Sequence, residues 1–123
     1  MKLNHTNLNT SDAPALVDFF IRFFGFELLG ERAGPFIWIL RGEDGFILTV
    51  MALKPGQPAN YPENFHVGFF VGKEELVRAK HAELTAAGFK PQEVERLKRG
   101  GQEVVTFYCR APGGILVEVA DWS

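Results

Sequence analysis

The chain reads as two similar halves, and this internal repeat constrains its fold more than any other feature. Each half begins with a strand-like stretch, at residues 2–9 and 65–71, and a helix follows it. In the first half, Ser11 and Asp12 offer helix caps, Pro14 suits a first helical turn, and Gly25 closes the segment. In the second half, Glu74 and Glu75 open the helix and Gly88 stops it. The order of elements is therefore predicted twice.

Three short strands are predicted after each helix. Patterns of apolar and β-branched residues bounded by turn residues indicate them at 26–31, 36–41 and 46–53 in the first half, and at 89–96, 103–110 and 115–121 in the second. The segment at 54–64 holds three prolines and one glycine, which predicts an irregular connector. Each half is thus strand–helix–strand–strand–strand.

Landmarks within the halves allow them to be aligned with each other. His5 matches His66 in the opening strands, Arg41 matches Arg110 before the last hairpin turn of each half, and the glycines after the helices also match. Carrying the arginine match forward places Thr49 opposite Glu118. A repeat of about 60 residues is too long for a solenoid unit.

These patterns predict an α+β fold in one domain, residues 1–123. Module one spans 1–53, the linker 54–64 and module two 65–123. Two half-sheets, each with a helix on its back, indicate a curved mixed sheet with a concave front and helices on the convex side. The alternative is a different α+β sheet in which the halves resemble each other by chance.

Composition excludes several classes of protein. The net charge is −2 and there is no basic run, so the electrostatic footprint of a nucleic-acid binder is absent. No stretch approaches the ~20 apolar residues of a membrane span, and we expect a soluble, cytoplasmic protein. The single cysteine, Cys109, excludes an intrachain disulfide and suits a reducing compartment.

Strand alternation turns two imidazoles and one carboxylate toward the predicted concave face. Apolar residues at alternate positions of 65–71 should pack against the helix, which sends His66 to the other side. The same alternation at 115–119 sends Glu118 forward, and His5 shares a face with Asn7. A Glu inside a cup is costly to desolvate unless its charge is compensated, and a divalent metal would do so. Such a set leaves coordination positions open for substrate.

Each of these residues also has a structural explanation. A single strand histidine is more often a hydrogen-bonded or surface residue than a ligand, and an isolated Glu118 is more often solvated. The matching positions of His5 and His66 favour the metal site. His81 falls in the second helix, where we expect no role in the site.

Three motifs resemble those of the vicinal oxygen chelate superfamily, which includes glyoxalases, bleomycin-resistance proteins and extradiol dioxygenases. They are Asn-His-Thr-Asn-Leu at 4–8 with Ser11-Asp12, Phe-His-Val-Gly-Phe at 65–69, and Arg-Ala-Pro-Gly-Gly-Ile-Leu-Val-Glu-Val at 110–119. The resemblance implies paired βαβββ modules around a divalent metal (Mn, Fe, Ni, Co or Zn) held by His5, His66 and Glu118. It also implies, for a short member, a homodimer with sites shared between chains.

The family position at Thr49 distinguishes between activities. Glyoxalase I enzymes carry a Glu there, so Thr49 argues against that activity. The remaining His, His, Glu set looks like that of extradiol dioxygenases and fosfomycin-resistance thiol transferases. The latter carry further Lys, Ser and Arg residues; Lys98, Arg99 and Thr106 lie in that region but cannot be matched one by one.

We therefore expect a metal-dependent enzyme that binds a small oxygen-bearing substrate, with dioxygenase or group-transfer chemistry and Glu118 as both ligand and catalytic residue. Asn7, Thr49 and Phe70 share the predicted concave face and are candidate substrate contacts. Two alternatives stay open: a drug- or metabolite-binding protein of the bleomycin-resistance type, and an accessory protein without a ligand. For three aromatic residues a core position is favoured over a pocket wall: Trp38, Phe107 and Tyr108.

Overall fold

The structure, a computed structural model, describes residues 1–30 and 36–122. The chain divides into two compact units, Met1–Tyr61 (the N-terminal unit) and Pro62–Ser123 (the C-terminal unit). The division falls within the connector predicted at 54–64.

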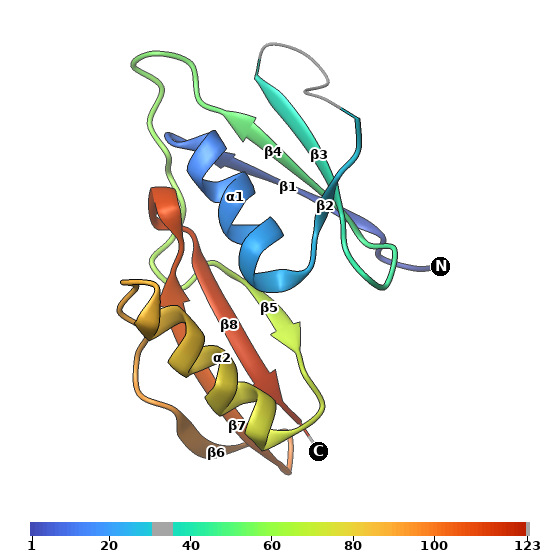
Figure 1. Cartoon of the computed structure of the whole chain (residues 1–123), viewed down its shortest axis with the longest axis vertical. Coiled ribbons are helices and arrows are strands. Elements are labelled where there is room, and N and C mark those ends of the chain that lie inside the picture. Colours follow the sequence, from blue (N-terminus) through green and yellow to red (C-terminus); the bar gives the residue numbers. More distant parts are fainter. Residues whose placement is uncertain (31–35, 123) are drawn as a thin grey trace. The chain divides into compact units, whose positions relative to one another are not determined.

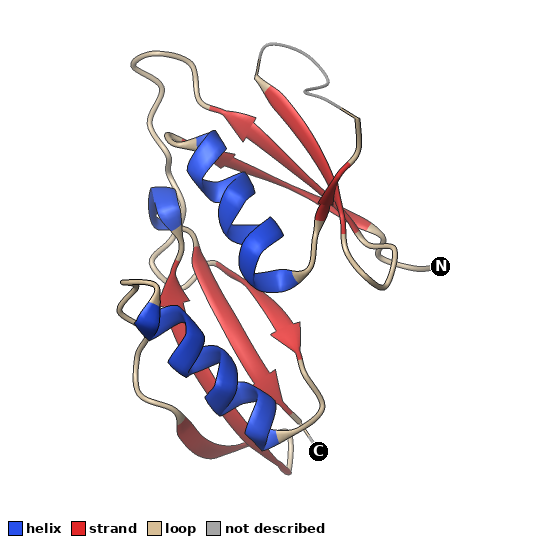
Figure 2. Cartoon of the chain, viewed as in Figure 1, coloured by secondary structure: helices blue, strands red, loops and turns tan. Residues whose placement is uncertain are grey.

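The N-terminal unit is a four-stranded mixed sheet with one helix (Figures 1 and 2). Its elements follow the chain order β1 (His5–Thr10), α1 (Ala13–Phe24), β2 (Glu27–Leu28), β3 (Ile37–Arg41) and β4 (Ile47–Ala52). In the sheet the order is β1-β4-β3-β2, with β1 parallel to β4 and the other pairs antiparallel.

The C-terminal unit repeats this plan. Its elements are β5 (His66–Phe70), α2 (Glu74–Ala86), β6 (Glu95–Arg99), β7 (Gln102–Arg110), a 3-10 turn (Pro112–Gly114) and β8 (Leu116–Asp121). The sheet order is β5-β8-β7-β6, and again only the first pair is parallel. The predicted α+β class and the twice-repeated order of one helix and four strands are confirmed.

Local signals explain where α1 begins and ends. The Asp12 side chain accepts a hydrogen bond from the backbone N–H of Ala15, which satisfies one of the donors left open at a helix start. Gly25 ends the helix in the left-handed conformation, with φ of 69°. Between them Leu16 and Phe20 are fully buried against the sheet, because helical spacing brings them to one side.

The second helix, α2, relies more on charge and packing than on a cap. Lys73 at its N-cap makes no side-chain cap, while Glu74 and Glu75 in the first turn suit the positive end of the helix dipole. Val77 and Leu84 are fully buried beneath it. Neither helix of the described residues is long and apolar enough to cross a membrane.

Strand register confirms the alignment of the two halves. His5 pairs with Ile47 as His66 pairs with Leu116, and Arg41 and Arg110 pair with the same two partners. Two residues further along, Asn7 lies beside Thr49, and Gly68 lies beside Glu118. Thr49 and Glu118 therefore occupy the same place in their sheets.

Two predicted strands are wrong in their bounds. The strand predicted at 89–96 is irregular up to residue 94, and β6 begins only at Glu95. Pro91 has no N–H for a strand ladder, and the N–H of Phe89 instead bonds the Leu84 carbonyl at the end of α2. The strand predicted at 26–31 is reduced to β2, Glu27–Leu28, and its predicted last residue, Glu31, lies outside the described residues.

Of the three aromatic residues expected in the core, Phe107 is there, with 1% of its surface exposed. Trp38 is half-buried and lies beside the fully buried Val50, on the core side. For Tyr108 the expectation is wrong. It is half-buried beside Glu118 on the other face of the sheet, because alternation in β7 turns it away from Phe107.

Candidate functional site

The C-terminal unit brings two predicted site residues together. Strands β5 and β8 are parallel neighbours, and His66 and Glu118 lie on the same face, opposite the buried Val117 and Val119. The His66 Nε2 atom is 3.6 Å from the Glu118 Oε1 atom. The predicted forward orientation of both residues agrees with this geometry.

The ring of His66 is oriented by a backbone contact. Its Nδ1 atom lies 2.9 Å from the carbonyl oxygen of Asn64. A carbonyl oxygen only accepts, so Nδ1 carries a proton, and in the neutral ring the lone pair is on Nε2, on the side of Glu118. A metal-binding histidine commonly has this arrangement.

Glu118 is buried and held by two donors that the sequence did not identify. Its side chain is 9% exposed. Its Oε2 atom accepts hydrogen bonds from Arg99 Nη1 and Thr106 Oγ1, each at 2.6 Å. Burial raises the pKa of the Glu118 carboxyl, but the hydrogen bonds from Thr106 and Arg99 more than offset burial and hold the pKa below its ordinary value.

Arg99 reaches this carboxylate because the β6–β7 hairpin curls over the sheet face. Arg99 pairs with Gln102, six residues from Tyr108 along β7, which in a straight strand is about 20 Å. Yet Arg99 Nη2 donates to the Tyr108 hydroxyl at 3.1 Å. The Tyr108 ring stands edge-on to that of His66, with centroids 5.3 Å apart. The hairpin therefore brings a cation to Glu118.

This arrangement corrects one step of the sequence argument. The burial of Glu118 suggested that a metal must compensate its charge. In the structure Arg99 and Thr106 already do so. The hydrogen bond to Glu118 also raises the pKa of Arg99. The sequence missed this because the strand predicted at 89–96 stops short of Arg99; only alternation along the true β6 places Arg99 on the side of Thr106.

The remaining predicted polar residues lie together in the N-terminal unit. His5 is exposed, and its Nδ1 atom is 2.7 Å from Asn4 Oδ1, so the neutral ring again has its lone pair on Nε2. Thr49 donates to Asn7 Oδ1 at 2.7 Å. These residues occupy the face opposite Leu8 and Val50, which are fully buried.

Phe70 and His81 lie on opposite faces of the C-terminal unit. Phe70 follows His66 on β5 at an even spacing, on the same face, and is 66% exposed. His81 is on α2, where its Nε2 atom lies 3.0 Å from the Gln92 carbonyl and its ring stands edge-on to Phe107. His81 is thus part of the helix side, as expected.

The donor geometry in the C-terminal unit fits a divalent ion. Two ligands at about 2.1 Å from one tetrahedral ion lie about 3.4 Å apart, close to the 3.6 Å between His66 Nε2 and Glu118 Oε1. Among the residues that the structure describes, no three His, Cys, Asp or Glu side chains form a group that could hold a metal. The third predicted ligand, His5, belongs to the other unit.

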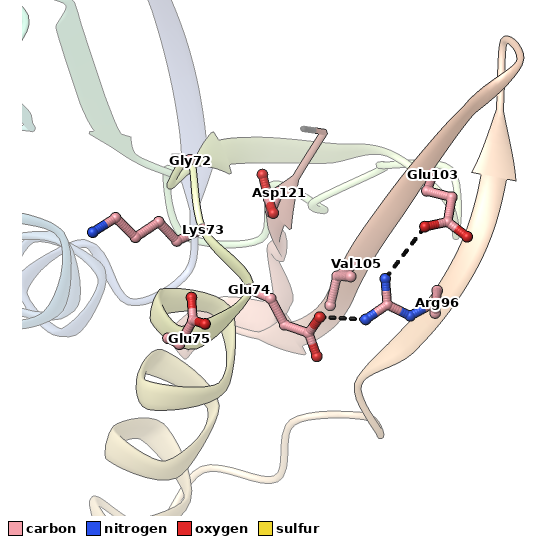
Figure 3. A pocket seen from close by; sticks show the side chains of 8 residues that line it. All are labelled: Gly72, Lys73, Glu74, Glu75, Arg96, Glu103, Val105 and Asp121. Carbon is pink, nitrogen blue, oxygen red and sulfur yellow. Dashed lines mark hydrogen bonds and ion pairs between the residues drawn. The ribbon is translucent and has the colours of Figure 1, made fainter.

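A shallow cavity of about 340 Å³ lies elsewhere, at the start of α2 (Figure 3). Arg96, on the helix side of β6, makes ion pairs there with Glu74 and Glu103. Its lining includes none of the predicted site residues. We therefore keep the candidate site on the opposite face, at Glu118.

Comparisons with known proteins agree with the repeat and the motifs. The model of the Glyoxalase/Bleomycin resistance protein/Dioxygenase superfamily matches residues 2–119. A possible glyoxalase from Bacillus cereus is 35% identical, with 97% of each chain covered and a TM-score of 0.80. No match was found among curated proteins.

Two more distant structures share the fold. A glyoxylase/bleomycin resistance protein/dioxygenase domain from a Frankia species is 15% identical, covers 100% of this chain and 98% of its own, and has a TM-score of 0.82. A lactoylglutathione lyase from Agrobacterium tumefaciens is 17% identical, with 98% and 92% covered and a TM-score of 0.75.

The contact between Arg99 and Glu118 should stabilise the metal-free protein. Arg99→Gln is expected to lower the free energy of unfolding by about 1.5–3 kcal/mol, because it leaves a buried carboxylate without its charged donor. Arg96→Gln is the matched control: Arg96 pairs on the same strand with the more exposed Glu74, and its loss should cost at most about 1 kcal/mol. Urea unfolding in EDTA measures both.

A further variant separates the pair from general disruption of the hairpin. In a Glu118→Gln background the cost of Arg99→Gln should shrink, because the partner charge is already gone. Equal costs for Arg99→Gln and Arg96→Gln, with no change in that background, would show that the contact contributes nothing.

Proposed function

The chain belongs to the glyoxalase/bleomycin resistance protein/dioxygenase superfamily, and on this basis we propose that it is a metal-dependent enzyme acting on a small oxygen-bearing substrate. The observation that carries the proposal is the pair of donor atoms in the C-terminal unit. His66 Nε2 and Glu118 Oε1 lie 3.6 Å apart, with the other ring nitrogen and the other carboxylate oxygen bound elsewhere.

We propose that His5, His66 and Glu118 hold one divalent ion. Imidazole nitrogen and carboxylate oxygen suit Mn, Fe, Ni, Co or Zn, and three protein ligands leave positions open. The Nδ1 atoms of His5 and His66 both face oxygen acceptors, which prepares both Nε2 atoms as ligands. When bound, the ion would supply Lewis-acid chemistry to a substrate oxygen.

The chain's own residues would bind and orient the substrate. Glu118 is the candidate catalytic residue, and Thr106 and Arg99 fix the direction of its carboxylate. Phe70 offers an exposed ring on the face of His66, suited to an apolar part of a small molecule. Asn7 and Thr49, joined by a hydrogen bond, offer polar contacts on the face of His5.

Thr49 favours dioxygenase or group-transfer chemistry over isomerisation. It occupies the place in its sheet that Glu118 occupies in the other. A threonine hydroxyl is too weak a base to move a proton near neutral pH. Glu118 would have to act alone, and its oxygens already serve Arg99, Thr106 and the proposed metal. Isomerisation remains the competing reaction, since the Bacillus cereus relative is described as a possible glyoxalase.

One observation favours a second function, a drug- or metabolite-binding protein without a metal. Arg99 compensates the charge of Glu118, so the site is electrostatically complete in the C-terminal unit alone. The exposed Phe70 would then serve an apolar ligand. Metal binding by the wild type separates the two functions.

We also propose that both modules form one superfamily domain and that two chains form a homodimer with shared sites. Strands β1 and β5 are edge strands within their own sheets, and edges in natural proteins are usually covered or paired. A cytoplasmic location is proposed from the sequence, in which the single cysteine, Cys109, suits a reducing compartment.

The metal proposal predicts about one divalent ion per chain. His66→Ala and Glu118→Ala should each weaken binding by about tenfold or more, because a ligand is lost. His81→Ala, a histidine on the helix side, should bind as the wild type does. Bound metal should raise the melting temperature, since only the folded state has the site. Elemental analysis of tag-free protein and titration with Mn, Fe, Ni, Co and Zn salts test this; a wild type that stays empty refutes it.

The shared site predicts complementation between two defective chains. If His5 comes from one chain and Glu118 from its partner, a heterodimer of His5→Ala and Glu118→Ala chains contains one intact site. Mixing the two after mild unfolding should restore about half of the wild-type sites per heterodimer. A monomer by light scattering at micromolar concentration would rule out the arrangement.

The role of Thr49 predicts little or no isomerisation of the methylglyoxal–glutathione adduct. Wild type and Thr49→Glu, loaded with Ni, Co or Zn, are assayed together, and Thr49→Gln controls for size without charge. Turnover that appears only in Thr49→Glu would support the need for a second carboxylate. Robust turnover by the wild type would overturn the assignment.

A further inference from the structure

The inference concerns the charge at Glu118 and rests on the proposed metal site. Arg99 binds one oxygen of the carboxylate, Oε2, while the other oxygen, Oε1, faces His66 Nε2. We propose that Arg99 is an internal counter-ion of Glu118 that competes with the metal for its charge and so weakens metal binding. Arg99 is a positioning residue in this account, because it acts through Glu118.

The geometry sets two cations on one carboxylate. Arg99 Nη1 is 2.6 Å from Oε2. A metal about 2.1 Å from Oε1 would lie on the order of 5–6 Å from the guanidinium. Glu118 is 9% exposed and Arg99 30% exposed, so water screens this repulsion only in part. The negative charge offered to the metal is correspondingly reduced.

Thr106 provides an internal comparison. Its hydroxyl donates to the same Oε2 atom, also at 2.6 Å, but carries no charge. Thr106 therefore orients the carboxylate without repelling a cation. If orientation alone mattered, losing either donor would weaken metal binding. If charge competition dominates, losing Arg99 strengthens binding while losing Thr106 weakens it.

Arg99 is placed where it can leave the carboxylate. It is the last residue of β6, and Gly100 and Gly101 follow it with φ of 56° and 80°, conformations that favour glycine. Thr106, in contrast, is 1% exposed in the middle of β7. When a metal binds, Arg99 can release Oε2 toward solvent while Thr106 keeps its contact.

Cobalt(II) titration of the full chain tests the inference, with affinity and the visible absorption of the bound ion as readouts. We expect Arg99→Gln to bind about tenfold tighter or more, and Arg99→Lys, which keeps the charge, to stay within about threefold of wild type. Thr106→Val should bind about tenfold weaker, with Thr106→Ser close to wild type. Arg96→Gln, which removes a cation from the helix side of the same strand, should leave the affinity unchanged.

The outcomes separate this inference from the proposed function. Arg99→Gln that binds no tighter than wild type, or weaker, overturns the inference and leaves the metal site standing. Binding by Arg99→Gln but not by wild type supports the inference and refutes a resident metal in the native protein. No binding by either refutes both. Arg99→Met, with an apolar stem in place of the guanidinium, replaces Arg99→Gln if that variant does not fold.

Discussion

The carboxylate of Glu118 is the constraint around which the C-terminal unit is organised. A buried carboxylate is stable only when its charge and lone pairs are satisfied, and here Arg99 and Thr106 satisfy them from β6 and β7. To deliver Arg99, the hairpin must curl toward the sheet face. That curl places Tyr108 between Arg99 and His66 and leaves one oxygen of Glu118 directed at the imidazole.

The repeated plan of the chain supports two chemically different sites in equivalent places. Asn7 and Thr49 in one sheet stand where Gly68 and Glu118 stand in the other. The first pair is neutral and satisfied by its own hydrogen bond. The second is an anion beside a residue without a side chain, and an added Cβ at Gly68 would meet Glu118 only at 3.7 Å. The open space there suits a small ligand above the carboxylate.

Much of this could be predicted from the sequence. The superfamily, the α+β class, the helices and six of the strands follow from periodicity, caps and turns, and the alternation in β5 and β8 correctly turned His66 and Glu118 to one face. The bounds of β6 could not be predicted, because its residues are mostly polar and Pro91 interrupts the preceding segment. With β6 misplaced, Arg99 had no assigned face, and Tyr108 was taken for a core residue.

What the sequence by itself determined is the set of local elements and the face of each strand, because helical spacing, capping and alternation act over a few residues. What only the tertiary structure decided is how the charge of Glu118 is balanced. Arg99 and Glu118 are 19 residues apart and meet only because the β6–β7 hairpin curls. Sheet curvature depends on packing across several strands, and no pattern within one strand specifies it. The presence of a carboxylate was therefore legible in the sequence, whereas its partner was not.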